Sequence, residues 1–474
     1  MLKNLLKDSF IYTLATVVSK GIGFFLLPII TLYIAPDAYG ALDLYLVFIS
    51  LVGVSVGLEL SQGLARYTAT ASLEEKQKLI STTVWFTLFI YVVFILFLLF
   101  FNKKINTLLI SEGSYNNVFT IIIFLLLFIK MDNILKSQLR WDLRVKQFAA
   151  VSILYSLIFA ISVYILLSKY SLGITGYFIG QFIATVTSMF IVIFLNKHYL
   201  KFLFSKTAFQ KLFQFSYPLV LSSLTIVAAT YIDRIIIKEL LDLTELGLYG
   251  IAFRFASLGG FLLVGIRGAL LPIIYREYEK PETKGKLRDF FYLFFAGMSA
   301  MLIFLCFFSQ ELLYVLTESS YHSAYSVIPI LTAAVLFNGM YIFAVGVSIA
   351  KKTKVFVYVG IFSLISNIVL NYIFIPIYGI QGAAMATFIT GVCSFVIYMF
   401  FSQKNYKVNY DFFKLGIVGL CLLLIYLGTS MFFKNTIEGL DAILILKKLL
   451  LTIMLSFGFT YFLLGKKILS GKII

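Results

Sequence analysis

The sequence predicts an all-α integral membrane protein, and three observations support this fold class. Of the 474 residues, 61% are hydrophobic and only 13% are charged, whereas soluble globular chains average about 45–50% apolar and about 25% charged residues. The apolar residues gather in segments of about 20 residues, the length that an α-helix needs to cross a bilayer. Most Lys and Arg residues lie between these segments. This composition excludes a soluble enzyme, a disordered regulator and a disulfide scaffold.

Fourteen membrane-spanning helices are expected from the apolar segments. The loops between them are short, which leaves no room for an extramembrane domain. The first segment is too long for the core of a signal peptide, so it is expected to be retained. The approximate ranges are 10–34, 41–63, 79–101, 117–137, 147–168, 174–195, 212–237, 246–273, 289–309, 326–349, 355–375, 380–401, 412–433 and 445–465.

The distribution of positive charge predicts the orientation. Of the 39 Lys and Arg residues, 27 lie in the even-numbered loops and the two tails, and 7 lie in the odd-numbered loops. Because Lys and Arg are enriched in cytoplasmic loops, both termini are expected in the cytoplasm. The same rule accounts for the net charge of +17, so no nucleic-acid partner is expected.

A weak internal repeat predicts how the chain is divided. Gly173-Ile174-Thr175-Gly176 and Gly379-Ile380-Gln381-Gly382 are 206 residues apart, and Gly40 and Gly247 are 207 apart. Both pairs occupy matching places on the outer side, as in transporters built from two parallel repeats. The expected domains are an N-terminal six-helix lobe at 1–205, a C-terminal six-helix lobe at 206–403, and two additional helices with a cytoplasmic tail at 404–474.

No metal, cofactor or nucleotide site is visible in the sequence. Cys306, Cys393 and Cys421 lie in separate apolar stretches, and His198 and His322 lie in different loops. These spacings fit neither a disulfide framework nor a zinc site. The phosphate-binding pattern Gly-x-x-x-x-Gly-Lys-Ser/Thr is missing, so no ATP-driven mechanism is expected.

Ionisable residues inside the expected spans are the candidates for function, because a charge at the centre of a spanning helix costs roughly 2.5–3.5 kcal/mol. Lys20 and Arg254 lie too deep to reach the interface easily, which favours a watery cavity. For Arg267 and Glu59 the alternative is snorkelling to the cytoplasmic interface. The full set is Lys20, Lys130, Arg234, Arg254, Arg267, Asp43, Glu59, Asp132 and Asp233.

These charges suggest an anion-binding site with acidic residues nearby. The basic residues suit a phosphate or diphosphate carried on a lipid; the predicted substrate-binding set is Lys20, Arg234, Arg254 and Arg267. The predicted coupling or gating set is Glu59, Asp43, Asp233 and Arg66.

Several structural alternatives and local features accompany these predictions. Asp233 and Arg234 alternatively form a local structural pair, and Lys130 and Asp132 alternatively lie where the fourth helix ends early. On one helix, Glu59 and Arg66 share a face. Gly259-Gly260 is expected to bend or unwind the eighth helix.

Several short motifs, taken together, resemble a known family. They are Ser19-Lys20-x-x-Gly23-Phe24, Pro36-x-x-Tyr39-Gly40, Gly57-Leu58-Glu59 with Arg66-Tyr67, Pro218 before Asp233-Arg234, Gly247-x-Tyr249-x-x-Ala252-x-Arg254, and Tyr378-Gly379-Ile380-x-Gly382-Ala383-Ala384. Over about residues 5–400 the chain resembles the bacterial polysaccharide-export and O-antigen flippase family. That family belongs to the multidrug, oligosaccharidyl-lipid and polysaccharide exporter superfamily.

The resemblance implies a V-shaped, two-lobed bundle in the bacterial cytoplasmic (inner) membrane. It implies an undecaprenyl-diphosphate-linked oligosaccharide, such as an O-antigen repeat of lipopolysaccharide or a capsular repeat, moved to the outer leaflet by alternating access. A cation gradient, of H⁺ or Na⁺, or the membrane potential would drive it. The expected partners are this substrate, membrane lipids and the glycan polymerase of the same pathway, with the chain itself a monomer. The related peptidoglycan-precursor flippase has a second basic residue where this chain has Leu26, so its full cationic set does not carry over.

Two other functions compete with this one. A cation-coupled multidrug exporter usually has twelve helices and takes cationic drugs, which suits acidic cavities. The two arginines of the eighth helix argue against that reading. A membrane-embedded glycan polymerase or sugar transferase would need a large outer loop, and the longest here are about 102–116 and 310–325. The second of these loops offers Glu311, Glu318 and His322.

Overall fold

The computed structural model describes residues 14–15, 17–19, 21–110, 115–260, 263, 278–350, 352, 354–432 and 442–465. Over these residues the regular structure is helical, with no strand. The prediction of an all-α membrane protein is therefore confirmed. Two compact units, Met1–Ile235 and Ile236–Ile474, divide the chain.

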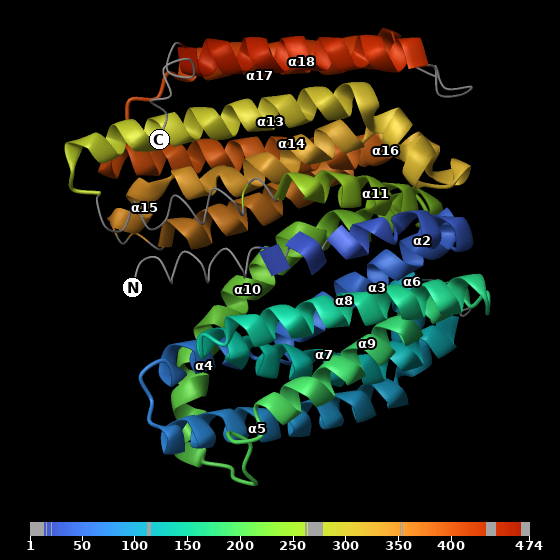
Figure 1. Cartoon of the computed structure of the whole chain (residues 1–474), viewed down its shortest axis with the longest axis vertical. Helices are drawn as coiled ribbons and strands as arrows, with labels where there is room; N and C mark the ends of the chain where they lie inside the picture. Colours follow the sequence, from blue (N-terminus) through green and yellow to red (C-terminus); the bar gives the residue numbers. More distant parts are fainter. Residues whose placement is uncertain are drawn as a thin grey trace. The chain divides into compact units, whose positions relative to one another are not determined.

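The first unit is built around helix α7 (Asn116–Trp141), which makes its most extensive contacts with three neighbouring helices (Figure 1). Those neighbours are α5 (Leu73–Phe100), α8 (Val145–Ser168) and α9 (Gly173–Leu195), and α8 also packs on α9. The remaining helices of the unit are α2 (Leu27–Tyr33), α3 (Pro36–Ser55), α4 (Leu60–Thr68), α6 (Asn102–Ile110) and most of α10 (Lys206–Leu240).

The second unit is organised around α13 (Pro281–Leu316) and α14 (Ile328–Gly339). Helix α14 packs on α16 (Lys354–Asn405), and α13 packs on α17 (Phe412–Phe432) and α18 (Ala442–Leu464) (Figure 1). At its core Phe291 is fully buried among other aromatic rings. The remaining elements are α11 (Leu243–Ala256), η2 (Ser257–Gly259), η3 (Ser319–Ser326), η4 (Met340–Phe343) and α15 (Val345–Ile349).

The number of membrane spans is only partly determined by the described residues. They contain ten helices that are long and apolar enough to cross a membrane, or eleven if one bent pair is a single span. Helix α16 alone covers two of the expected spans, 355–375 and 380–401, and is kinked at Gly379. The expected first and eighth spans run partly outside the described residues. Fourteen spans therefore remain a prediction.

The first glycine of each repeat motif has a positive φ. Gly173 has φ of +51° and Gly379 has φ of +58°, a region that residues with a side chain rarely occupy. The last glycine of each motif lies against the preceding helical segment: a Cβ at Gly382 would collide with the carbonyl oxygen of Phe374, and one at Gly176 would lie 3.3 Å from Cβ of Leu166 in α8. This shared geometry explains why both repeats place glycine at these positions.

A polar cluster fastens the end of α7 to the start of α5. Nζ of Lys76 lies 2.9 Å from Oδ1 of Asp142. Partial burial acts to raise the pKa of Asp142, but the hydrogen bond from Lys76 and the nearby polar groups of Gln138 and Tyr199 outweigh it and lower the pKa below its ordinary value. The folded protein therefore stabilises the ionised form of this carboxyl group.

Replacing Asp142 with Asn is expected to lower the free energy of unfolding at pH 7 by about 1–2 kcal/mol. Because the folded pKa is depressed, this contribution is present above the unfolded pKa of about 3.9 and is lost as the pH falls through the folded value. Thermal unfolding of the purified protein should show a gap between wild type and variant at pH 7 that narrows on acidification. Glu74→Gln, which removes an exposed i,i+4 partner of Lys78, is the control; equal melting temperatures for Asp142→Asn and wild type at pH 7 would contradict the prediction.

Candidate functional site

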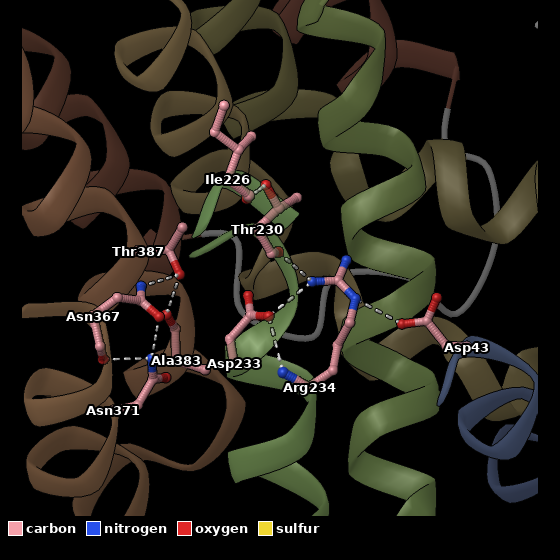
Figure 2. A network of polar contacts seen from close by, with 9 residues as sticks. All are labelled: Asp43, Ile226, Thr230, Asp233, Arg234, Asn367, Asn371, Ala383 and Thr387. Carbon is pink, nitrogen blue, oxygen red and sulfur yellow. Dashed lines mark hydrogen bonds and ion pairs between the residues drawn. The ribbon is translucent and has the colours of Figure 1, made fainter. Parts of the chain in front are cut away.

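A buried arginine in α10 joins two carboxylates. Arg234 is 1% exposed. Its Nε donates to Oδ2 of Asp43 at 2.9 Å, and its Nη1 donates to Oδ1 of Asp233 at 2.8 Å (Figure 2). Nη1 also reaches the carbonyl oxygen of Thr230 at 3.3 Å. The guanidinium therefore ties α10 to the second turn of α3.

This cluster brings together three of the residues singled out in the sequence. Asp43 and Asp233 were expected to serve in coupling, and Arg234 was expected to bind substrate. With two acids and one base, the three side chains carry a net charge of −1. A buried guanidinium satisfied by two carboxylates holds the helices together, and it becomes available to an anion only when a carboxylate releases it.

Arg254 lies in the last turn of α11 and is half-buried. The helix ends two residues later at Ala256 and is followed by the 3₁₀ turn Ser257–Gly259. This turn is a tighter coil that interrupts the α-helix, and the bending or unwinding expected at Gly259-Gly260 stays a prediction. The range expected for this helix was wrong at its start, because α11 begins at Leu243 and includes Glu245 in its first turn. Lys20 and Arg267, the two other predicted substrate-binding residues, lie outside the described residues.

The second expected span is not one continuous helix. Helix α3 ends at Ser55 and α4 begins at Leu60. Between them Leu58 and Glu59 both take the left-handed backbone conformation, with φ of 49° and 50°. The sequence prediction assumed an unbroken helix over 41–63, and that assumption was wrong because two left-handed residues cannot continue a right-handed helix.

The break separates Glu59 from the residue expected to share its face. The guanidinium of Arg66 lies 4.6 Å from the ring centroid of Phe215 in α10, a cation–π contact. Within the described part of the chain, Glu59 and Arg66 form no ion pair. Glu59 itself is half-buried at the N-terminal end of α4.

Lys130 and Asp132 lie well inside α7, which continues to Trp141. The alternative that the fourth helix ends before them was therefore wrong. Nζ of Lys130 donates to the carbonyl oxygen of Gly53, in the last turn of α3, at 2.8 Å. Asp132, which is 4% exposed, accepts a hydrogen bond from Oγ of Ser188 at 2.6 Å and pairs with Lys136 at 2.7 Å.

The ion pair between Asp132 and Lys136 could have been predicted from the sequence. They are four residues apart, a spacing that places an acid and a base side by side on a helix. In the charge count Lys136, at the end of the expected span 117–137, was treated as a cytoplasmic loop residue. The longer helix places it inside the bundle instead, with its ammonium 4.8 Å from the ring centroid of Tyr155.

A second buried ion pair lies in the unit Ile236–Ile474. Nζ of Lys448 in α18 lies 2.5 Å from Oε1 of Glu311 in α13, and both side chains are buried. The sequence placed Glu311 in the outer loop 310–325, which was wrong because α13 extends to Leu316. Lys448 lies near the start of the expected span 445–465 but entered the charge count as an outer-loop residue, whereas it lies inside α18. Glu318 accepts hydrogen bonds from Ser319 and the backbone N–H of Ser320. These loop acids are engaged in structural contacts and do not form an acid–base pair.

A polar cluster that lies within α16 was not predicted by the sequence analysis. Nδ2 of Asn371 donates to Oδ1 of Asn367 at 2.9 Å, and Nδ2 of Asn367 donates to Oγ1 of Thr387 at 3.3 Å (Figure 2). Among the residues that the structure describes, no three His, Cys, Asp or Glu side chains gather closely enough to hold a metal ion.

Two family models match the chain. The polysaccharide biosynthesis protein family matches residues 5–277, and the MatE family matches residues 218–373. Two proteins of Haemophilus influenzae (strain ATCC 51907 / DSM 11121 / KW20 / Rd) are similar in sequence. Lsg locus putative protein 1 is 22% identical over 58% of this chain and 67% of its own length, and an uncharacterized membrane protein is 23% identical over 60% and 68%.

Solved structures share the fold. The lipid II flippase MurJ in an inward closed conformation is 20% identical, with a TM-score of 0.76 over 95% of this chain and 98% of that chain. An inward-facing multidrug resistance transporter of the MATE family, in the MOP superfamily, is 14% identical, with a TM-score of 0.65 over 82% and 94%. The fold is therefore that of these membrane transporters.

Proposed function

Because the chain belongs to the polysaccharide biosynthesis protein family, we propose that it is a flippase for an undecaprenyl-diphosphate-linked oligosaccharide. It would move an O-antigen or capsular repeat unit from the cytoplasmic leaflet to the outer leaflet of the bacterial inner membrane. The family match, which covers more than half of the chain, carries this proposal. The likeness to a lipid II flippase supports it, because that protein also handles a lipid-linked precursor.

In this proposal the cations inside the spans bind the diphosphate. A diphosphate brings about two negative charges and many acceptor oxygens, which Arg can engage in a bidentate manner. Lys20, Arg254 and Arg267 contribute to this site. Because it is held by Asp43 and Asp233, Arg234 joins them when H⁺ or Na⁺ neutralises one of the two carboxylates.

Replacement of a carboxylate by the substrate diphosphate at Arg234 would couple an ion gradient to alternating access. Neutralising Asp43 weakens the attraction that ties α3 to α10, and binding of the substrate anion compensates Arg234 for the lost partner. Glu59 and Arg66, at the two ends of α4, act in gating. The protein works as a monomer among membrane lipids with both termini in the cytoplasm, and it passes its cargo to a glycan polymerase.

Transport by the purified full-length chain tests the function. Proteoliposomes are prepared with a fluorescent undecaprenyl-diphosphate-linked oligosaccharide, and its appearance in the opposite leaflet is followed by an impermeant enzyme that cleaves the exposed sugar. We expect translocation that depends on the protein and on an imposed H⁺ or Na⁺ gradient. Translocation no faster than in protein-free vesicles, with every lipid-linked sugar and gradient, would refute the proposal.

Arg254 provides the sharpest mutational test of the proposed site. Arg254→Ala is expected to weaken substrate binding roughly 10- to 150-fold, the loss of one charge-assisted hydrogen bond. Arg254→Lys keeps the charge but loses the bidentate geometry, so partial transport is expected. The measurement is the transport rate against lipid-linked sugar concentration. Wild-type transport by a stable Arg254→Ala protein would remove Arg254 from the site.

A multidrug exporter is the second candidate, favoured by the MatE match at residues 218–373. The same vesicles separate the two functions. Efflux of a cationic dye that is competed by other cationic drugs, without translocation of lipid-linked sugars, would favour the exporter.

A further inference from the structure

Lys130 reaches the break between α3 and α4, and its contacts differ from those of the cations that form ion pairs. Lys136, Arg234 and Lys448 each contact a carboxylate oxygen at 2.5–2.9 Å. The hydrogen bond of Lys130 goes to a neutral carbonyl group, that of Gly53. In the described part of the chain, Lys130 takes part in no ion pair. An ammonium group has three donors, so two of them are available to a ligand.

The backbone leaves space for this ammonium group. A Cβ at position 57 would collide with both Nζ and Cε of Lys130. Glycine at position 57 therefore permits the lysine side chain to reach the break. Since Gly53, Gly57 and Lys130 all belong to the unit Met1–Ile235, this arrangement is internal to that unit.

The break is also strained. Leu58 and Glu59 are consecutive left-handed residues with side chains, a backbone conformation that is unfavourable for such residues. Strain of this kind persists where the surrounding structure imposes it, and it is concentrated at sites that bind ligands or change conformation. The Glu59 carboxylate acts electrostatically on Lys130 without pairing with it among the described residues.

A half-buried ammonium group with free donors is stabilised by an anion nearby. We infer that Lys130 is a further binding residue for the phosphate groups of the lipid carrier, and that Glu59 balances its charge when no phosphate is bound. The inference rests on the proposed function for the identity of the ligand. It assigns to α7 a direct role in substrate binding, at the place where the second span is interrupted.

Binding of a short lipid diphosphate tests this inference. The full-length protein in detergent is titrated with farnesyl diphosphate, and with farnesol as the ligand without phosphate. Lys130→Gln is expected to weaken farnesyl diphosphate binding about 10- to 100-fold and to leave farnesol binding unchanged. Lys130→Arg should retain most of the affinity, because it keeps the charge.

Two further variants separate a binding role from a structural one. Gly57→Ala keeps every charge but displaces the ammonium group, so it should also weaken farnesyl diphosphate binding. Lys136→Gln removes a lysine of the same helix that is already paired with Asp132. It should lower the melting temperature and leave the affinity within about twofold of wild type.

Each outcome decides the inference. Wild-type affinity in Lys130→Gln, or in Gly57→Ala if Lys130→Gln does not accumulate, would overturn it. A wild-type protein that does not bind farnesyl diphosphate would overturn both the inference and the proposed ligand class. Lys130-dependent binding without any translocation of lipid-linked sugars would refute the proposed function and leave the phosphate site standing.

Discussion

Replacing Arg234 with Ala is expected to destabilise the folded protein by about 3–5 kcal/mol, the typical cost of leaving buried charges without their partner. Asp233 is 3% exposed, and both it and Asp43 contact the guanidinium at 2.8–2.9 Å. Without it the two carboxylates repel each other in a poorly solvated place. We expect little monodisperse protein in detergent extracts and a strongly lowered melting temperature.

A variant that removes all three charges is the control for this prediction. Replacing buried ion pairs with neutral side chains of similar size is often tolerated. The triple substitution Arg234→Met, Asp43→Asn and Asp233→Asn should therefore recover much of the stability lost in Arg234→Ala, yet remain inactive in transport. If Arg234→Ala were as stable as wild type and failed only in substrate binding, the guanidinium would be a ligand group and not a structural link.

The second large loss of stability is expected when the ion pair between Lys448 of α18 and Glu311 of α13 is broken. Lys448→Met should destabilise the protein by about 3–5 kcal/mol, because the buried carboxylate of Glu311 would lose its only cation among the described ion pairs. The second oxygen of that carboxylate, Oε2, already has no hydrogen-bond partner. Thermal unfolding followed by tryptophan fluorescence or size-exclusion chromatography measures the loss.

The neighbouring lysine provides a matched control. Lys447 is exposed on the same helix, so Lys447→Met should change the melting temperature little. The double variant Glu311→Gln, Lys448→Met should be more stable than Lys448→Met alone, since no charge is left buried. Equal melting temperatures for the Lys447 and Lys448 variants would show that the pair does not hold α18 in place.

The fold class and the family were determined by the sequence, because both depend on short stretches of chain. An apolar segment of spanning length forms a helix in a bilayer regardless of its neighbours. Gly173 and Gly379 take positive φ within their own turns, so the repeat that they mark could be recognised without a structure. The family motifs are equally local, and the match over residues 5–277 confirmed the resemblance that they suggested.

The partners of the charged residues were decided by the tertiary structure. Arg234 and Asp43 are 191 residues apart in the chain, Lys448 and Glu311 are 137 apart, and Lys130 and Gly53 are 77 apart. Hydropathy assigned Glu311 to a loop because it scores a charge as if it faced the lipid alone. The free energy of burying a charge depends on the partner that helix packing brings within about 3 Å. Only the packed structure therefore determined which of these charges are paired and which, like Lys130, retain donors for a ligand.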